Sequence, residues 1–434
     1  MTASRCPVQH EAVLAEDPLW EELYDVRNEA LAMGNLIDGD PYADLARLRE
    51  QAPVHRGSAR SLMGLPEHYR HVMAEGRQAY CALSFAACEA AFRDPKHFSS
   101  HIVHHPNPDN EKTMVILEMD GAEHRAYRRT LQPIFIRPQA FGWWRTRFID
   151  EIVELLVDRL KQQDRAELNL ELCARLPVHT ITRAMGLKGE DALTFRKAFH
   201  SSGLRGISDD VRREAAQTIQ RMLMGEIAKR HADPQDDLIT RLITAEVRLP
   251  SGEVRKLTDR EAMHTARLVM VAGGGTTWRQ MGIVLYALLT HPEALAAVRE
   301  DRALIENAVD EATRWNPTAP VFNRLVTTDT ELHGVSIPAG SVMEICLGAA
   351  NRDPSRWDNP DQFDLFRAAQ PHLGFGIGEH RCMGIDVARS EMIGAISALL
   401  DAFPNLRLDP DQPVPHMTGG LEQRGVSALP VLLG

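Results

Sequence analysis

The sequence predicts a mainly α-helical fold with small β-sheets, in the α+β class. Apolar residues recur at i, i+3 and i+4 through most of residues 123–255 and again through residues 258–290, which is the spacing of amphipathic helices. Alternation of polar and apolar residues, the pattern of strands, is concentrated in residues 323–347. Helices should therefore dominate, and the strands should be few and short.

The chain divides into a polar, loosely packed N-terminal lead-in, residues 1–40, and a single domain, residues 41–434. Its 434 residues, 44% of them hydrophobic, suffice to bury a large core. Neither an internal repeat nor a low-complexity linker interrupts the domain. A helix over 41–53 is followed by a stretch of poor periodicity, after which residues 77–85 predict a strand and residues 86–94 a helix.

Helices should follow one another after residue 123, because short glycine or proline punctuation separates segments of helical spacing. The segments predicted as helices in this region are 148–162, 171–187, 191–202, 209–231 and 236–246.

A long helix is predicted from Thr258 to about Thr290. It opens with the capping box of Thr258 and Glu261 and is stopped by His291-Pro292. Three successive glycines in its middle, 273–275, destabilise a helix by about 2 to 3 kcal/mol relative to alanines. A flat cofactor or substrate lying against the helix would explain them, as would a distorted groove or the close packing of another helix.

Strand signals appear only after a helix over about 292–315. Residues 323–347 predict strands with turns at His333-Gly334 and 338–340, and residues 416–433 predict further short strands. Residues 351–366, NRDPSRWDNPDQFDLF, form an irregular, proline-punctuated stretch, the meander, which leads toward residues 372–384.

Composition excludes several classes of protein. The net charge is −11, so the overall field does not suggest nucleic-acid binding. The six cysteines lack C-x-x-C spacing, which argues against a zinc ribbon or disulfide framework and for a reducing compartment. The N-terminus is polar and acidic, and no apolar run approaches the ~18 residues of a spanning helix. We expect a soluble, cytoplasmic protein.

Four histidines fall in a loop rich in Pro, Asn and Asp that begins near His97. No carboxylate accompanies them at a fixed spacing, so we favour a solvated loop or substrate-facing wall over a metal site. They are His97, His101, His104 and His105.

Residues 372–384, HLGFGIGEHRCMG, are the segment that most strongly indicates a functional site, and we call them the cysteine loop. Cys382 follows three glycines and precedes a predicted helix, a position that favours thiolate through the helix dipole. A lone anchoring thiolate suits a haem iron better than a zinc site. The alternative, a buried cysteine in a glycine-rich turn, is common in α/β proteins.

The spacing F-x-x-G-x-H-x-C-x-G resembles the haem-binding loop of the cytochrome P450 family, in its soluble bacterial type. Glu311 and Arg314 match the E-x-x-R pair of that family, a buried clamp for the cysteine loop. The family's third clamp member comes from the meander, and the matching place here is near Gln362, so the triad is incomplete or completed by another residue.

The resemblance implies the P450 fold, with haem b between the long helix and the cysteine loop and Cys382 as the axial ligand of its iron. It also implies that His124, Arg128, Arg324 and His380 bind the haem propionates. The full set of implied cofactor-binding residues is His124, Arg128, Ala272, Gly273, Arg324, Phe375, Gly376, His380, Cys382 and Gly384.

Residues 272–277, AGGGTT, resemble the family's distal motif A-G-x-[D/E]-T-T. Thr276 then matches the hydroxyl that assists oxygen activation and proton delivery, with Gly275 and Thr277 as its catalytic neighbours. Gly275 departs from the pattern, because the acid position has no titratable group. Protons would then come through ordered water, the substrate, or a side chain such as Arg279 or Gln280.

The resemblance implies a monooxygenase, an oxidoreductase that acts on paired donors with O2. It would hydroxylate or O- or N-dealkylate a small or medium apolar molecule, using electrons from NAD(P)H through a reductase and a ferredoxin or flavodoxin. Gly275 leaves open a peroxide-driven or reductase-type enzyme, and a haem sensor without turnover is a further alternative.

Substrate contacts are implied for the loop 101–117, the region 195–207 and single residues on later elements. Those residues are Val269, Thr318, Ala319, Val321 and Thr418. A basic spot formed by Arg125, Arg128, Arg129 and Arg381 would steer an acidic electron donor.

Overall fold

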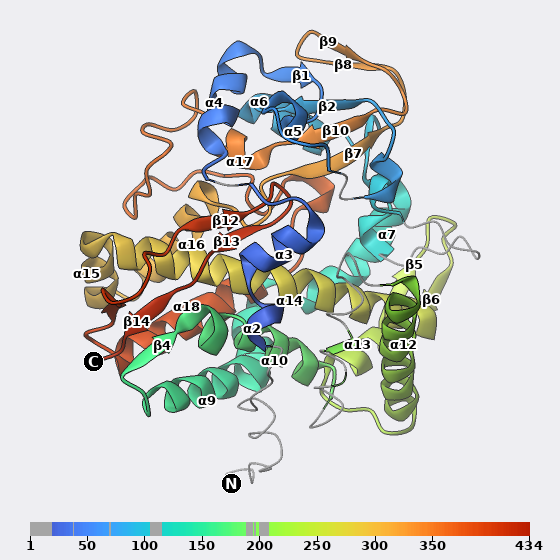
Figure 1. The fold of residues 1–434 in the computed structure, drawn as a ribbon. Coiled ribbons are helices and arrows are strands. Elements are labelled where there is room, and N and C mark those ends of the chain that lie inside the picture. The colour runs from blue at the N-terminus through green and yellow to red at the C-terminus, as the bar shows by residue number, and fades with distance from the viewer. Residues whose placement is uncertain are drawn as a thin grey trace.

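A computed structural model describes residues 20–37, 39–68, 71–104, 115–187, 194, 197–198 and 208–434. Within these residues the protein is mainly helical and carries small sheets, which confirms the predicted fold class. Figure 1 shows the helix α14 (Asp259–Thr290) crossing the middle of the molecule. Helices lie on both sides of α14, and the largest sheet lies on one side of it (Figure 1).

The remaining α-helices range from single turns to the 24 residues of α12. They are α2 (Trp20–Leu23), α3 (Val26–Met33), α4 (Tyr42–Gln51), α5 (Ala59–Leu62), α6 (Phe85–Arg93), α7 (Gly121–Leu131), α8 (Arg137–Gln139), α9 (Asp150–Leu160), α10 (Arg175–Ala184), α12 (Asp209–Ala232), α13 (Leu238–Thr244), α15 (Pro292–Glu300), α16 (Leu304–Trp315), α17 (Leu347–Ala350) and α18 (Ile385–Ala402).

The strands are short, as predicted. They are β1 (Val54–Arg56), β2 (Ala79–Ala82), β3 (Phe98–Ser99), β4 (Arg165–Glu167), β5 (Glu246–Arg248), β6 (Val254–Lys256), β7 (Phe322–Val326), β8 (Thr330–Leu332), β9 (Val335–Ile337), β10 (Val342–Ile345), β11 (Arg407–Leu408), β12 (Met417–Gly419), β13 (Arg424–Val426) and β14 (Pro430–Leu432).

The largest sheet has the strand order β1-β2-β10-β7-β3. Strand β10 runs parallel to β2 and antiparallel to β7, so the residues before the cysteine loop join the sheet to the N-terminal part of the chain. A hydrophobic core that includes Phe92, Met343 and Trp357 packs α6 against this sheet. The larger core is helical and surrounds α14.

Helix α14 begins as predicted. The side chain of Thr258 accepts a hydrogen bond from the backbone N–H of Glu261, and the Glu261 carboxylate accepts one from the N–H of Thr258. The helix continues without a break through its three glycines. A Cβ on Gly273 would lie 2.8 Å from Cδ1 of Ile181, so α10 packs closely on α14 at this glycine and a larger residue would displace the end of the Ile181 side chain.

Three sequence-based expectations differ from the structure. Residues 20–37 are not a loose lead-in, since Trp20, Val26 and Ile37 are buried in the fold. The helix expected over 292–315 is two helices, α15 and α16, because the Asp301 carboxylate accepts a hydrogen bond from the N–H of Ala303 and turns the chain.

Strand β1 lies in the stretch of poor periodicity and was missed, because three residues are too few to show alternation. The helix predicted over 191–202 lies almost wholly outside the described residues.

No single described helix has both the length and the apolar composition of a membrane span. By those two criteria alone, the pair α14 and α15 passes together, with an angle of 103° between the two helices.

One carboxyl in the helical core lacks a charged partner among the described residues. Glu391, on α18, is 3% exposed, and one of its oxygens has no hydrogen-bond partner. Burial raises the pKa of Glu391 to about 8, and the nearby hydroxyl of Thr180 opposes that shift. The carboxyl is therefore held protonated in the folded protein at neutral pH.

We predict that Glu391→Gln removes part of the pH dependence of stability. A carboxyl with a raised pKa stabilises the fold fully below pH 4.5 and loses that contribution as pH rises to about 8. As pH rises between those two values, the free energy of unfolding of the variant should increase by about 4 kcal/mol relative to that of wild type. Urea unfolding at pH 5 and pH 9 measures the difference.

The exposed Glu300, on α15, supplies the matched control, Glu300→Gln. Glu344, whose pKa burial raises to about 7, remains in every variant and cancels from the comparison. Equal pH dependence in wild type and Glu391→Gln would show that Glu391 is not held protonated.

Candidate functional site

The cysteine loop is built on glycines that no other residue can replace without strain. Gly376 and Gly378 have φ of 66° and 77°, in the left-handed region. A Cβ on Gly378 would also lie 2.8 Å from the carbonyl oxygen of Phe92, at the end of α6. The N–H of Cys382 donates to the carbonyl of Phe375 over 2.8 Å and closes the loop. These constraints fix where the sulfur lies.

Cys382 is exposed on one side and crowded by protein on the others. Burial among protein atoms raises the pKa of Cys382, opposed by the N–H of Gly384 and by the charges of Arg128 and Arg381. The N–H of Gly384 and the two arginines favour thiolate, in the direction that the sequence predicts, but desolvation outweighs them. A cation bound at the sulfur would reverse the balance.

The middle of α14 presents an uncovered face. Val271 is 36% exposed and Ala272 is also exposed, although the helix crosses the centre of the molecule (Figure 1). Thr276, one turn after Ala272, is half-buried and donates its hydroxyl proton to the Ala272 carbonyl over 2.7 Å. Thr277 is buried and lies about 140° around the helix from Ala272. The uncovered face thus carries Ala272 and Thr276 but neither Gly273 nor Thr277.

Two imidazoles, of His124 and His380, and the guanidinium of Arg324 lie near the cysteine loop. His124 is 1% exposed, and neither of its ring nitrogens has a hydrogen-bond partner. Its ring lies 4.2 Å from that of His380. Burial lowers the pKa of His124 to about 4, helped by the charges of His380 and Arg128. The ring is therefore neutral and offers one N–H donor.

Arg324, on β7, is buried as well. Within the described chain its hydrogen bond goes to the carbonyl of Asn323, 2.9 Å away. Burial lowers the pKa of Arg324 to about 10, although the charge of Asp120 opposes this. A buried guanidinium with spare donors is suited to binding carboxylates.

Besides lying next to His124, the ring of His380 contacts a carboxylate. Its Nε2 lies 3.2 Å from the carboxylate of Asp120, the residue before α7. Burial raises the pKa of Asp120, but hydrogen bonds from His380, Ser99 and Ser100 outweigh it and hold that pKa below its usual value. Asp120, which the sequence did not single out, therefore orients His380.

Arg128 uses one of its donors on the cysteine loop, and its predicted contact with a propionate stays a prediction. Its guanidinium donates to the carbonyl of Arg381 over 2.8 Å, and burial lowers its pKa while the charge of Cys382 opposes that shift. Arg128 thus contacts the cysteine loop itself.

The donor set fits haem. The exposed sulfur of Cys382 suits a metal, the uncovered face of α14 is formed by small residues, and unsatisfied nitrogens of His124 and Arg324 suit carboxylates. Within the described residues, no group of three or more His, Cys, Asp or Glu side chains is arranged to hold a metal ion.

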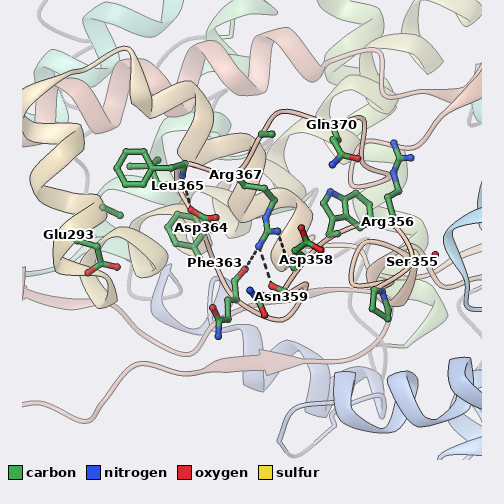
Figure 2. Close-up of a pocket in the computed structure, with 16 residues that line it drawn as sticks. Glu293, Ser355, Arg356, Asp358, Asn359, Phe363, Asp364, Leu365, Arg367 and Gln370 are labelled. Atoms are coloured by element: carbon green, nitrogen blue, oxygen red, sulfur yellow. Dashed lines mark hydrogen bonds between the residues drawn. The ribbon is translucent and has the colours of Figure 1, made fainter.

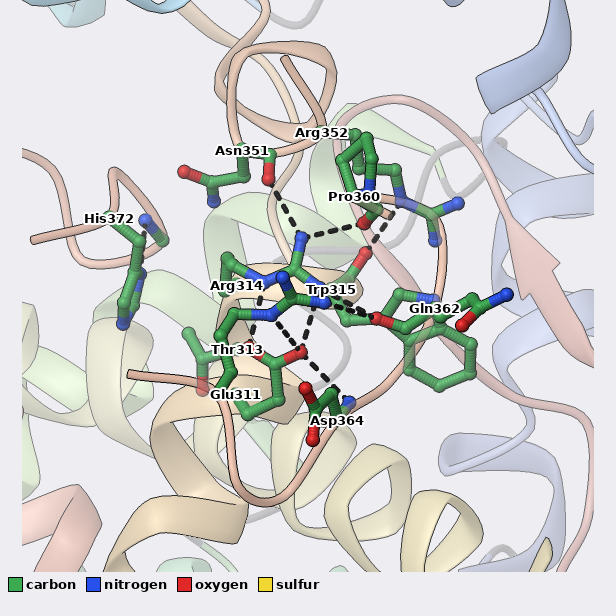
Figure 3. A network of polar contacts seen from close by, with 12 residues as sticks. Glu311, Thr313, Arg314, Trp315, Asn351, Arg352, Pro360, Gln362, Asp364 and His372 are labelled. Atoms are coloured by element: carbon green, nitrogen blue, oxygen red, sulfur yellow. Dashed lines mark hydrogen bonds and ion pairs between the residues drawn. The ribbon is translucent and has the colours of Figure 1, made fainter. Parts of the chain in front are cut away.

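The predicted clamp is a buried network that fastens the meander (Figure 3). Arg314 donates to Glu311 through two nitrogens at 2.8 Å each, and to the backbone carbonyls of Asn351, Pro360 and Gln362. The clamp reaches the cysteine loop through Asn351, whose side chain accepts a hydrogen bond from the N–H of Leu373 over 2.7 Å.

The triad is complete, and its third member is Arg367. Nε of Arg367 donates to the Glu311 carboxylate over 3.0 Å, and its guanidinium also reaches the carbonyl of Gln362. Of the two sequence-based alternatives, an incomplete triad or one completed by a residue other than Gln362, the structure shows the second. The signal was an arginine at the end of the meander, but the irregular chain gave no spacing from which to choose it.

Most residues implied to contact substrate have backbone or core partners. The hydroxyl of Thr318 donates to the carbonyl of Arg424, and Val321 packs in a hydrophobic cluster. Ala319 and Thr418 are buried, whereas Val269 is half-buried. Residues 105–114 lie outside the described residues, and so does nearly all of 195–207.

Two of the loop histidines contact carboxylates. His97 pairs with Asp94, and Nδ1 of His104 lies 2.6 Å from the buried carboxylate of Glu118. The ring of His101 stacks on that of His104. His105 is outside the described residues.

A surface hollow of about 580 Å³ lies over the meander (Figure 2). Arg367 is one of the residues that line this hollow, and it donates to the carbonyls of Asp358 and Asn359. Its lining includes neither Cys382 nor any residue of α14, so it is separate from the site described above.

Comparison with known proteins agrees with this geometry. Residues 198–427 match the model of the family described as cytochrome P450. The cytochrome P450 monooxygenase PikC of Streptomyces venezuelae is 31% identical over 424 residues, covering 92% of each chain. Among solved structures, the cytochrome P450 PksS of the Bacillus subtilis bacillaene polyketide synthase has a TM-score of 0.78 at 26% identity, covering 91% of this chain and 97% of its own. P450BioI, solved with an acyl carrier protein ligated to hexadec-9Z-enoic acid, has a TM-score of 0.76 at 26% identity and covers 91% and 99%.

We predict unequal contributions from the two arginines of the clamp. Arg314→Gln removes both of its hydrogen bonds to the buried Glu311 and leaves the carbonyls of Asn351 and Pro360 without this donor, so it should destabilise the fold by about 3–5 kcal/mol. Arg367→Gln leaves Glu311 paired with Arg314 and should cost about 1–2 kcal/mol. Midpoints of urea unfolding give both values, and equal losses would contradict the network.

Proposed function

Because this chain belongs to the cytochrome P450 family of haem-dependent monooxygenases, we propose that it inserts one oxygen atom of O2 into a small or medium apolar molecule. The reaction would be a hydroxylation or an O- or N-dealkylation. The observation that carries the proposal is the pairing of a glycine-constrained cysteine loop with an uncovered face of α14 that bears Thr276.

We assign the binding of haem b to residues on both sides of this site. Cys382 would supply the sulfur ligand of the iron, and His124, His380 and Arg324 would bind the propionates. The bound haem supplies the redox chemistry by which O2 is reduced and the substrate oxidised. The protein holds the ligand sulfur in place and neutralises the two carboxylates.

Thr276 is the residue placed to assist oxygen activation. Because its hydroxyl proton is donated to the Ala272 carbonyl, the oxygen lone pairs remain able to accept a hydrogen bond from water. Gly275 adds no acid, so protons would have to arrive through water on the uncovered face of α14.

The electron donor is proposed to be an acidic protein of ferredoxin or flavodoxin type. Arg125 and Arg381 are exposed beside the cysteine loop, although Arg125 is partly neutralised by Glu379 at 2.7 Å. Arg129 is exposed, and among the described residues no ion pair involves it. The positive charge of these exposed arginines would attract an acidic partner to the surface beside the cysteine loop.

The experiment is a search for substrates followed by isotope incorporation. Apolar compounds that shift the spin state of the ferric haem are then turned over with NAD(P)H, a reductase and a ferredoxin under ¹⁸O2. The proposal predicts one ¹⁸O atom in the hydroxylated product. Product formed only with added peroxide would favour the peroxide-driven alternative that Gly275 suggests, and binding without any product would favour a sensor.

We predict that Arg129→Gln slows reduction by an acidic donor about three- to tenfold at low salt and less than twofold at high salt, because salt screens exposed charges. Stopped-flow reduction at two ionic strengths measures both rates. Arg221→Gln, on the exposed surface of α12, is the matched control. An effect of Arg129→Gln that does not depend on salt would contradict electrostatic steering.

A further inference from the structure

A buried ion pair adjoins the turn of α14 that carries Thr276. The guanidinium of Arg279 donates through Nη1 to the carbonyl of Gly275 and through Nη2 to the carboxylate of Glu29, on α3. The side chains are 4% exposed for Arg279 and 19% for Glu29. The two residues are 250 positions apart in the sequence. The N-terminal helix α3 is thereby tied to the centre of α14.

The guanidinium is enclosed as well as paired. Its Cζ lies 4.6 Å from the centre of the Trp278 ring. A Cβ on Gly425 of β13 would come within 3.4 Å of Cγ of Arg279 and 2.9 Å of Cγ2 of Val26. Helix α3, strand β13 and helix α14 therefore meet at this side chain. Little room remains for Arg279 to adopt another rotamer.

Arg279 also occupies the space beside the missing acid. A Cβ built on Gly275 would lie 3.6 Å from Nη1 of Arg279. The position where the related family motif places a carboxylate is therefore flanked by a fixed positive charge. A guanidinium carries five N–H donors and no acceptor, so Arg279 can hold a carbonyl and a carboxylate at the same time.

We propose that Glu29 and Arg279 are positioning residues for oxygen activation. Glu29 orients the guanidinium, and the guanidinium holds the carbonyl of Gly275, the residue before Thr276. The peptide between Gly275 and Thr276 is thereby fixed, which keeps the Thr276 hydroxyl directed at the carbonyl of Ala272. This inference rests on the proposed function and extends the active turn of α14 to a residue of the N-terminal helix.

The test compares Glu29→Gln and Arg279→Lys with wild type. The first variant removes the charge of the carboxylate. The second keeps the positive charge but supplies a single ammonium group, which lacks the fork that reaches both partners at once. Glu21→Gln, an exposed carboxylate on the adjacent helix α2, is the matched control.

Two readouts separate positioning from a structural role. Coupling, the product formed per NAD(P)H consumed, should fall about five- to tenfold in both variants, while the substrate Kd from the spin-state shift stays within about twofold. Hydrogen–deuterium exchange of the 270–280 segment, measured with and without haem, should rise in both variants and not in the control.

Unchanged coupling in Glu29→Gln would overturn the inference. So would a parallel loss of coupling, substrate affinity and unfolding temperature, because that pattern indicates general destabilisation. Failure of the proposed function looks different: wild type itself would then form no product from O2. If Arg279→Lys does not fold, Glu29→Gln decides the outcome alone.

Discussion

The rest of the structure depends on one constraint, a sulfur atom that must act as an anion in a crowded position. Protein atoms around Cys382 raise the pKa of its thiol, and the nearby N–H of Gly384 and two arginines do not compensate. A metal cation at the sulfur changes that balance, because a coordinated thiol loses its proton. The proposal that Cys382 binds a haem iron therefore accounts for a thiol held in this position.

Several distant elements keep the loop in its place. Left-handed glycines allow its course, α6 packs against Gly378, and the Glu311–Arg314–Arg367 network fixes the meander from which the loop emerges. Asn351 joins that network to the loop through the N–H of Leu373. Helix α14 leaves Val271 and Ala272 exposed, while α10 packs against it at Gly273. In the proposed site, the same helix is both a structural support and a wall.

The elements that the sequence predicted are those defined by local spacing. The capping box at Thr258, the cysteine motif and the i, i+3 pair of Glu311 and Arg314 can each be found within a short window, and the structure confirms the capping box and the pair. What could not be predicted depends on the path of the chain. Arg367 reaches Glu311 from the end of an irregular meander, and Glu29 meets Arg279 from the other end of the sequence. The glycine at 273 was ambiguous, because a sequence does not tell a contact with a helix from a contact with a cofactor.

The most direct measurement is the absorbance of the reduced protein after exposure to carbon monoxide, for wild type and for Cys382→Ser. A haem iron bound by thiolate gives a strongly red-shifted Soret band, so wild type should show that band and the variant should lose it. Absence of the band in haem-loaded wild type, or its survival in Cys382→Ser, would contradict the assignment of Cys382 as the ligand.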